Sequence, residues 1–232
     1  MSPTGPADAE PSTPPLDALR VLAAQEVEVA DGFRHLELFT LGGLVTVLWH
    51  GPPDADRAVL AVGGAMGGLL GPADGLYHDL GMALADQGIG TLRISYRRPN
   101  DLDRCVHDVV AVADLAGRRG ARRFVTMGHS FGGAVAVRAG AMLARHTTGV
   151  VTLATQSAGC EVADQLGDIP LLAFHGTADE LLPPASSEMV AMLAERAELV
   201  VLPGAGHLLS EAGDELRQRL GTWIPERLAE AP

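Results

Sequence analysis

The stretch RRFVTMGHSFGGAVAVRAG, residues 122–140, places one serine, Ser130, between glycines where an apolar run ends and a run of small residues begins. The run RRFVTMG is typical of a buried strand, and the Ala- and Gly-rich run that follows is typical of a helix. Glycines suit a tight strand-to-helix turn because Cβ atoms beside its central residue would clash. Ser130 is therefore either a small residue in a structural turn or a nucleophile displayed on one.

Further apolar runs like the one before Ser130 continue along the chain, short and rich in Val, Leu and Ile. They are residues 57–64, 88–96, 149–155, 169–176 and 197–204. Runs of this kind suit strands buried on both faces of a parallel sheet. Helical segments alternate with them, at 75–88, 101–120, 132–146, 185–197 and 210–230. This alternation predicts an α/β fold with a mostly parallel, doubly wound sheet.

The N-terminal part has a different pattern. Prolines are frequent at the start, so residues 1–20 are predicted to be a disordered, Pro-rich lead-in to a single domain over residues 21–232. Short apolar segments between Val27 and His50, separated by the turn signals DG and GG, predict an antiparallel β-ribbon.

The composition limits the partners. The formal net charge is −12 at pH 7, and a cationic field is what draws proteins to phosphates, so we expect neither nucleic acid nor a membrane as a partner. All 17 basic residues are arginines. Chemistry that needs a lysine, such as a Schiff base, a Walker A site or a Ser-Lys dyad, is therefore excluded.

The expected compartment is the cytoplasm. No apolar run reaches the roughly 18 to 20 residues of a membrane span, and the start lacks the pattern of a signal peptide. The two cysteines, Cys105 and Cys160, are expected to be buried thiols. Cys105 and His107 point to different sides of a predicted helix, so no metal site is predicted there.

Two residues that could assist Ser130 follow later predicted strands. Asp179 lies in HGTADELLPP after one strand, and His207 lies in PGAGHLL after the next. Ligands of open parallel sheets collect at the carboxyl ends of the strands, where all three residues are expected. A serine hydroxyl becomes nucleophilic when a base removes its proton and a carboxylate orients that base. The pattern favours a catalytic triad of Ser130, His207 and Asp179.

Other polar residues near these segments could serve the same roles. Asp168 and Glu180 are reserve candidates for the acid. His129 and His175 neighbour the predicted site in sequence, but packing or local hydrogen bonding is favoured for both.

An oxyanion hole needs two N–H groups near the reacting carbonyl. One is expected from Phe131, directly after the serine. The other is expected from the glycine-rich loop VGGAMGG, residues 62–68, where Ala65 is the first candidate and Met66 the second.

The motifs GHSFGG, HGTADELLPP and GAGH resemble the elbow, acid and histidine motifs of the α/β-hydrolase fold superfamily, over about residues 27–230. Within it, the chain resembles most the dienelactone hydrolase-like proteins and the small serine esterases. The resemblance implies the α/β-hydrolase fold and a cofactor-free serine hydrolase with the triad given above. One departure is that Gly63 and Gly64 stand where the family usually has a His-Gly pair.

The substrate is predicted only by class. About 14 residues separate TLAT from PLLAF, where many family members insert a helical cap, so no lid domain is expected. An open site favours a small or exposed ester, thioester or lactone. Arg97 and Arg98 follow a strand at the same sheet edge and are candidates for binding an acidic substrate, although surface arginines in solvent or in salt bridges are favoured.

Two alternatives to hydrolysis stay open. The same triad would support an acyltransferase, or a biosynthetic enzyme that opens or forms a lactone. A non-catalytic ligand-binding protein on the same fold is the third interpretation.

Overall fold

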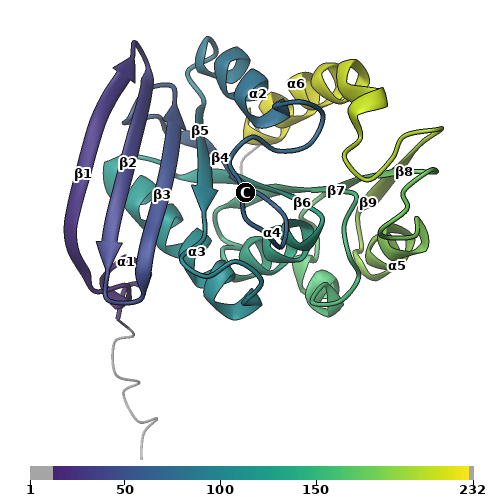
Figure 1. Ribbon diagram of the computed structural model, residues 1–232, viewed down its shortest axis with the longest axis horizontal. Helices are drawn as coiled ribbons and strands as arrows, with labels where there is room; N and C mark the ends of the chain where they lie inside the picture. The colour runs from purple at the N-terminus through teal and green to yellow at the C-terminus, as the bar shows by residue number, and fades with distance from the viewer. Residues whose placement is uncertain (1–12, 230–232) are drawn as a thin grey trace, which may run out of the picture.

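A nine-stranded mixed sheet runs through the part of the chain, residues 13–229, that the computed structural model describes (Figure 1). Its strand order is β1-β2-β3-β5-β4-β6-β7-β8-β9. The strands are β1 (Val21–Ala30), β2 (Phe33–Thr40), β3 (Gly43–His50), β4 (Arg57–Val62), β5 (Gly90–Ser95), β6 (Arg123–His129), β7 (Thr147–Leu153), β8 (Leu171–Gly176) and β9 (Ala197–Leu202).

The pairing of the strands confirms the predicted topology. β1, β2 and β3 form an antiparallel ribbon, and β3 joins β5 in antiparallel orientation. All later neighbours, from β5 to β9, are parallel. Because β4, β6, β8 and β9 run in the same direction, their carboxyl ends lie at one edge of the sheet.

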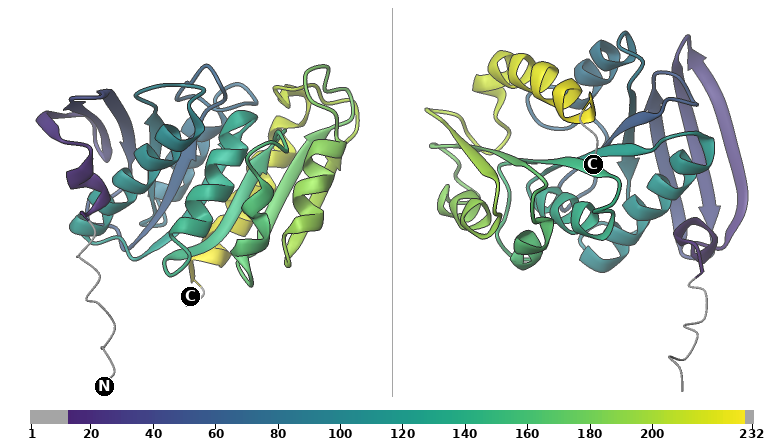
Figure 2. Two further views of the ribbon diagram at one scale, coloured as in Figure 1. Left: turned by 90° about the horizontal axis from the view of Figure 1, so that it is seen from below. Right: turned by 180° about the vertical axis from the view of Figure 1, so that it is seen from behind.

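Helices cover both faces of the sheet (Figure 2). They are α1 (Pro15–Ala18), α2 (Leu76–Ala85), α3 (Leu102–Arg119), α4 (Phe131–Met142), α5 (Ala185–Leu193) and α6 (Gly213–Ala229), with the 3₁₀ turns η1 (Glu161–Leu166) and η2 (Ser210–Ala212). α2 and α6 lie on one face, while α3, α4 and α5 lie on the other (Figures 1 and 2). The described chain therefore has three layers, as the strand and helix alternation predicted.

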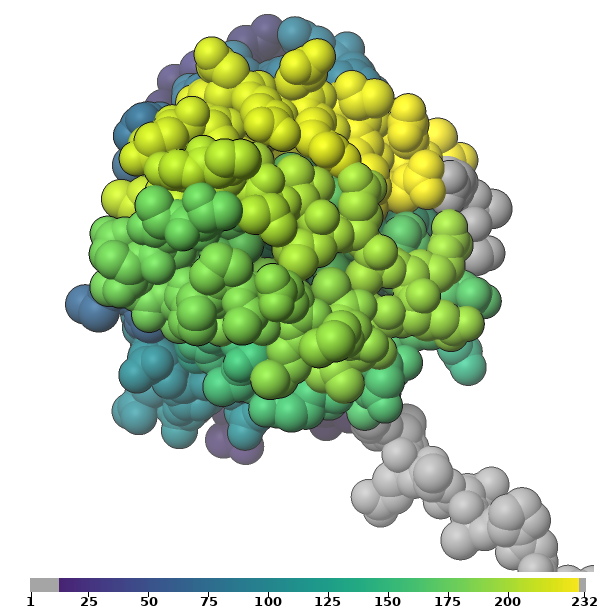
Figure 3. All heavy atoms as spheres, turned by 90° about the vertical axis from the view of Figure 1, so that its right-hand side faces the viewer, coloured from purple at the N-terminus to yellow at the C-terminus, as the bar shows by residue number. Residues whose placement is uncertain are grey.

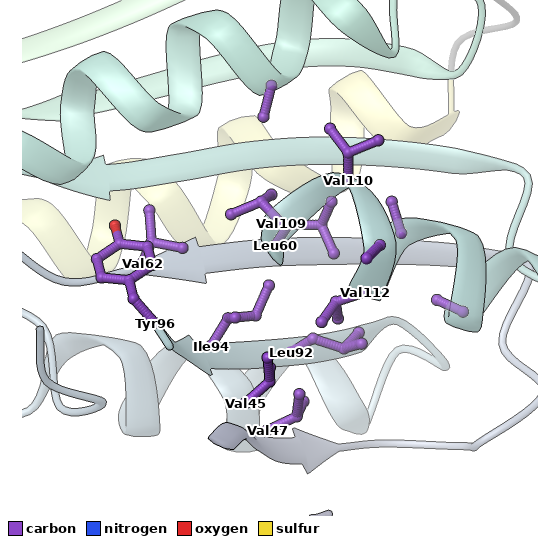
Figure 4. Packing of buried hydrophobic residues seen from close by; sticks show 14 of the residues in the cluster. Val45, Val47, Leu60, Val62, Leu92, Ile94, Tyr96, Val109, Val110 and Val112 are labelled. Atoms are coloured by element: carbon purple, nitrogen blue, oxygen red, sulfur yellow. The ribbon is translucent and has the colours of Figure 1, made fainter. Parts of the chain in front are cut away.

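Side-chain alternation along the strands builds a separate core on each face. On β5, Leu92 and Ile94 point toward α3, where they pack with Val109 and Val112 (Figure 4). Full burial of such aliphatic side chains stabilises a fold by roughly 1.5–3 kcal/mol each. Arg93, the residue between them, lies on the α2 face.

The lead-in differs from its prediction as far as it is described. Residues 1–12 lie outside the described residues, but α1 forms a helical turn within residues 13–20. Pro15 suits the first turn of a helix, and the Leu16 N–H donates to Asp114 Oδ2 of α3 at 3.0 Å. Leu19 is 2% exposed in the core below the sheet. These contacts order residues that the proline content alone predicted to be disordered.

The segment where a cap would be inserted is short, as predicted. Between β7 and β8 the chain forms only loops and η1, which packs with α4 and α5.

Figure 3 faces the β9 side of the molecule, with the yellow residues of α6 uppermost and the light green residues of α5 and β9 below them. No helix within residues 13–229 combines the length and hydropathy that a membrane span requires.

Candidate active site

Four loops meet at the carboxyl edge of the sheet around a cavity of about 510 Å³. Ser130 follows β6, His207 follows β9, and both line this cavity. The loop 63–71 after β4, His129, Leu181 and Leu208 complete its wall. The structure thus places Ser130 and His207, two of the three residues predicted for the triad, in the wall of one cavity. The third residue, Asp179, does not line the cavity but contacts His207.

The turn at Ser130 explains the glycines of its motif. Ser130 has φ 57° and ψ −121°, which is a conformation that residues other than glycine seldom adopt. A Cβ at Gly128 would lie 1.8 Å from Gly132 O, and a Cβ at Gly132 would lie 2.3 Å from Gly63 O. The turn can form only with glycine at both positions, and it leaves Ser130 half-exposed at the start of α4.

His207 is oriented by Asp179. Its Nδ1 lies 2.8 Å from Asp179 Oδ2, and the two side chains are 9% and 0% exposed. A carboxylate only accepts hydrogen bonds, so Nδ1 carries the proton in this pair and Nε2 of the neutral ring keeps a free lone pair. The histidine can therefore accept a proton through Nε2.

Asp179 is held as a carboxylate by its own loop. Its Oδ1 accepts hydrogen bonds from the N–H groups of Leu181 at 2.9 Å and Leu182 at 2.8 Å. Burial acts to raise the pKa of Asp179, but the hydrogen bonds from Leu182, His207 and Leu181 outweigh it and leave that pKa below its ordinary value. The acid beside His207 thus stays ionised at neutral pH.

His175 contacts the same carboxylate. Its Nε2 lies 3.1 Å from Leu182 O and 3.2 Å from Asp179 Oδ2, and its Nδ1 lies 2.6 Å from Ser187 Oγ. Since a carbonyl only accepts, Nε2 carries the proton and Ser187 donates to Nδ1. Sequence reasoning expected local bonding at His175 but missed the contact with Asp179, which its spacing of four residues from that acid could have suggested.

His129 connects the serine turn to the histidine loop. Its Nε2 lies 2.9 Å from the backbone O of His207, and the two rings are 4.9 Å apart between centroids. Burial lowers the pKa of His129 to about 4, although the hydrogen bond to His207 O opposes this effect. At neutral pH the ring is therefore uncharged and donates through Nε2.

The loop after β4 is folded tightly beside Ser130. The Gly67 N–H donates to Gly64 O at 2.9 Å. Gly64 lies next to Ser130, because a Cβ added to Gly64 would be 3.5 Å from the Cβ of Ser130. A Cβ at Gly63 would meet Gly67 O at 2.5 Å. This turn leaves no room for a histidine at position 63, which explains the departure from the usual His-Gly pair.

Both tyrosines of the chain hold the start of this loop. Tyr77 donates to Val62 O at 2.8 Å, and Tyr96 donates to Gly63 O at 3.0 Å, both in the protein interior. The red oxygen atom in Figure 4 is the Tyr96 hydroxyl, close to Val62. The carbonyl groups of Val62 and Gly63, which are successive in the chain, thereby each accept a hydrogen bond from a buried tyrosine hydroxyl.

The predicted oxyanion donors lie on either side of this turn. Phe131 begins α4, and Ala65 lines the cavity. Within residues 13–229, neither of their N–H groups donates to a backbone carbonyl. Both are thus available for a bound oxygen atom. Met66, the second candidate, also lines the cavity, and its side chain is 93% exposed.

The two arginines proposed for an acidic substrate do not line the cavity. Arg97 forms a 2.5 Å ion pair through Nε with Asp108 Oδ1, and its N–H donates to Asp108 Oδ2 at 2.9 Å. Burial raises the pKa of Asp108, while these contacts with Arg97 oppose the rise. Arg98 is exposed on the loop after β5. Arg97 therefore serves the packing of α3 against the sheet.

Other chemistry suggested by the sequence has a structural explanation. Cys105 and Cys160 are free and buried, and burial raises the pKa of each thiol to about 12. Inert thiols are expected from such values. Among the described residues, no group of three or more His, Cys, Asp and Glu side chains could hold a metal ion.

No family model and no curated protein matches the sequence. Solved structures do match the fold. Est1E from Butyrivibrio proteoclasticus is 18% identical with a TM-score of 0.69, covering 89% of this chain and 99% of its own. XC6422 from Xanthomonas campestris, described as an α/β serine hydrolase without lid, is 21% identical with a TM-score of 0.67 and coverages of 89% and 100%.

A dienelactone hydrolase from Anabaena variabilis is also similar, with 19% identity, a TM-score of 0.70 and coverages of 88% and 99%. The similarity extends over nearly the whole of these proteins. The chain therefore has the α/β-hydrolase fold in its lidless form, as its motifs predicted.

Proposed function

We propose that the protein is a serine hydrolase that cleaves a small carboxylic ester, thioester or lactone through an acyl-enzyme. The observation that carries this proposal is the 2.8 Å contact of His207 Nδ1 with Asp179, which leaves Nε2 as a base beside a cavity that Ser130 also lines. The hydrolases among the structures of similar fold support it.

The first half of the reaction forms the acyl-enzyme. Ser130 Oγ attacks the carbonyl carbon while His207 Nε2 takes the proton of the serine hydroxyl. The π electron pair of the carbonyl group moves to the carbonyl oxygen. When the tetrahedral intermediate collapses, the bond to the alcohol oxygen breaks and Nε2 returns the proton to the leaving alcohol. Asp179 holds the ring in place and stabilises its positive charge.

The second half repeats this chemistry with water. His207 Nε2 takes a proton from water, which attacks the acyl carbon, and the carboxylic acid leaves as the proton returns to Ser130. The N–H groups of Phe131 and Ala65 donate to the oxyanion in both halves. Loss of one such donor costs about 10²- to 10³-fold in kcat in enzymes of this kind.

The test combines covalent labelling with turnover. Wild type exposed to a fluorophosphonate is expected to gain one adduct by intact mass, and Ser130→Ala is expected to gain none. The control Ser186→Ala removes another serine hydroxyl and should label normally. Wild type should also hydrolyse 4-nitrophenyl acetate and butyrate, with kcat at least about a thousandfold lower in Ser130→Ala. A wild type that gains no adduct and turns over no ester would overturn the proposal in favour of ligand binding alone. A fully active Ser130→Ala would exclude Ser130 as the nucleophile and overturn the proposed mechanism.

A further inference from the structure

The side chains of the cavity wall are apolar apart from Ser130, His207 and His129. Its residues other than Ser130, His129 and His207 are five glycines, one alanine, one methionine and four leucines. No carboxylate, guanidinium or amide side chain is among them. Apart from the groups assigned to the reaction, no side chain of this wall as described could pair with a charge on the substrate.

Four exposed side chains surround the mouth of the cavity, and we call them the apolar rim. Met66 and Leu70 follow β4, Leu181 follows β8, and Leu208 follows β9; they are 93%, 63%, 69% and 60% exposed. Single exposed leucines are ordinary on a protein surface. The convergence of four such side chains, from three loops, on the cavity that contains Ser130 indicates a contact surface for an apolar group.

Arg97, Arg93 and Arg217 are already engaged, and the exposed Arg98 does not line the cavity. Arg97 is bound to Asp108, and Arg93 is 2% exposed and donates to Leu69 O at 3.3 Å from below the loop. Arg217, next to the neighbouring hollow, is bound to Asp79 at 2.7 Å. An anionic substrate would therefore find no arginine in the cavity wall that the described residues form.

The neighbouring hollow behind the histidine loop is acidic. Its wall includes the carboxylate residues Asp74, Glu211, Asp214 and Glu215. Glu211 lies close to the site, because its Oε2 accepts a hydrogen bond from the Gly206 N–H at 3.1 Å, next to His207. Together with the net charge of −12, these carboxylates repel anions that approach the mouth.

We propose that the substrate is an ester whose groups next to the scissile bond are apolar and uncharged, lying against the apolar rim, and that the site discriminates against esters that bear a carboxylate there. This inference rests on the proposed hydrolase function. Since no cap within residues 13–229 covers the rim, only the part of the substrate that touches it is desolvated. Each methylene that reaches the rim should raise kcat/KM by about fourfold, and longer chains should add nothing.

A pair of matched aryl acetates tests the charge preference. 4-Acetoxybenzamide and 4-acetoxybenzoate have nearly the same shape, but only the second carries a carboxylate at neutral pH. Hydrolysis of both compounds is measured by the release of the phenol. Wild type is expected to show a kcat/KM at least about tenfold higher for the amide than for the benzoate. The difference should shrink at high salt because screening weakens the repulsion. An equal or higher kcat/KM for the benzoate would overturn the inference.

Rim variants test the apolar contact. Met66→Ser and Leu208→Ser are expected to lower kcat/KM for 4-nitrophenyl hexanoate about tenfold, mainly through KM, with a smaller effect on the acetate. Met192→Ser and Leu22→Ser are matched controls at side chains 79% and 67% exposed on α5 and β1, away from the cavity. Rim variants that behave like these controls would contradict the inference.

Fluorophosphonate labelling separates the two levels of failure. Wild type that gains no adduct and hydrolyses no ester would overturn the proposed function and this inference with it. The substrate class alone would be overturned in two cases in which wild type still gains the adduct on Ser130. In the first, wild type prefers the carboxylate ester; in the second, the rim variants hydrolyse the hexanoate as well as the control variants do.

Discussion

The Nε2 of His129 lies 2.9 Å from the backbone O of His207, across a sequence separation of 78 residues. One end of this hydrogen bond is the residue directly before Ser130, and the other is the backbone of the residue that Asp179 orients. The bond thus fixes the serine turn relative to the histidine loop without involving either reacting atom. We interpret His129 as a positioning residue for the Ser130 and His207 pair.

A donor at the His129 Nε2 position should be needed for this role. His129→Leu removes it and is expected to lower kcat about tenfold with little change in KM, because a small misplacement of reacting groups is costly. His129→Gln places an amide N–H near the same point and should recover most of kcat. Steady-state kinetics of both variants, with circular dichroism to check the fold, measures the effect. Equal kcat values for the two variants would contradict the positioning role.

The carboxylate of Asp179 should be needed to orient His207. Asp179→Asn is expected to lower kcat by about a thousandfold or more, because an amide can donate to Nδ1 and then favours the wrong tautomer of the ring. Asp168→Asn and Glu180→Gln change the two other acids considered from the sequence and should leave kcat within about twofold. The same assay with 4-nitrophenyl butyrate compares all three. A loss at Glu180 or Asp168 instead would reassign the acid.

The Tyr96 hydroxyl should support the oxyanion loop through Gly63 O, which it binds at 3.0 Å. Tyr96→Phe leaves this carbonyl without its donor, which costs about 1–3 kcal/mol in the free energy of unfolding. If the loop shifts, kcat should fall while labelling of Ser130 persists. Thr126→Val is a matched control, since it removes a buried hydroxyl that donates to Ala136 O at 2.9 Å, remote from this loop.

Urea unfolding and kinetics distinguish the two effects. Tyr96→Phe and Thr126→Val are expected to lose similar stability, while only Tyr96→Phe loses about tenfold in kcat. An unchanged kcat in Tyr96→Phe would show that the hydroxyl contributes to folding alone.

The sequence predicts the central fold well because its strands are buried on both faces. β4 contains an unbroken apolar run, AVLAV, and the glycines after it mark where the strand ends. The first strand lacks this signal. β1 begins at Val21, before the apolar segment that starts at Val27, and all its residues are exposed at the sheet edge. An edge strand with alternating Glu and Val carries little hydrophobic signal.

The candidate site is predictable where its residues lie in the loops after strands, as Ser130, Asp179 and His207 do. The contacts that support them are not, because their partners are backbone carbonyls, which any residue type could provide. His129 to His207 O and Tyr96 to Gly63 O are two such contacts. Arg97 was predicted at the correct edge, but Asp108 on the buried face of α3 binds it. A carboxylate in an apolar helix face was the signal for that pair.

A buried histidine outside the site should make stability depend on pH. His50 is 0% exposed, stacks on Phe33, and has no hydrogen-bond partner for either ring nitrogen within the described chain. Burial, helped by the charges of Arg93 and His78, lowers the pKa of His50 to about 4. The ordinary value in an unfolded chain is about 6.5, so the unfolded state binds more protons between these two values.

Stability should therefore be full above about pH 6.5 and should fall as the pH drops toward 4. At pH 5 the loss due to His50 is about 2 kcal/mol. His50→Phe removes the titrating ring while keeping an aromatic side chain against Phe33, so its free energy of unfolding should decrease less between pH 7.5 and pH 5. Thr91→Val, a buried and non-titrating change on the paired strand, should keep the wild-type pH dependence. Urea unfolding of the three proteins at both pH values measures this, and identical pH dependence in His50→Phe and wild type would exclude His50 as a source.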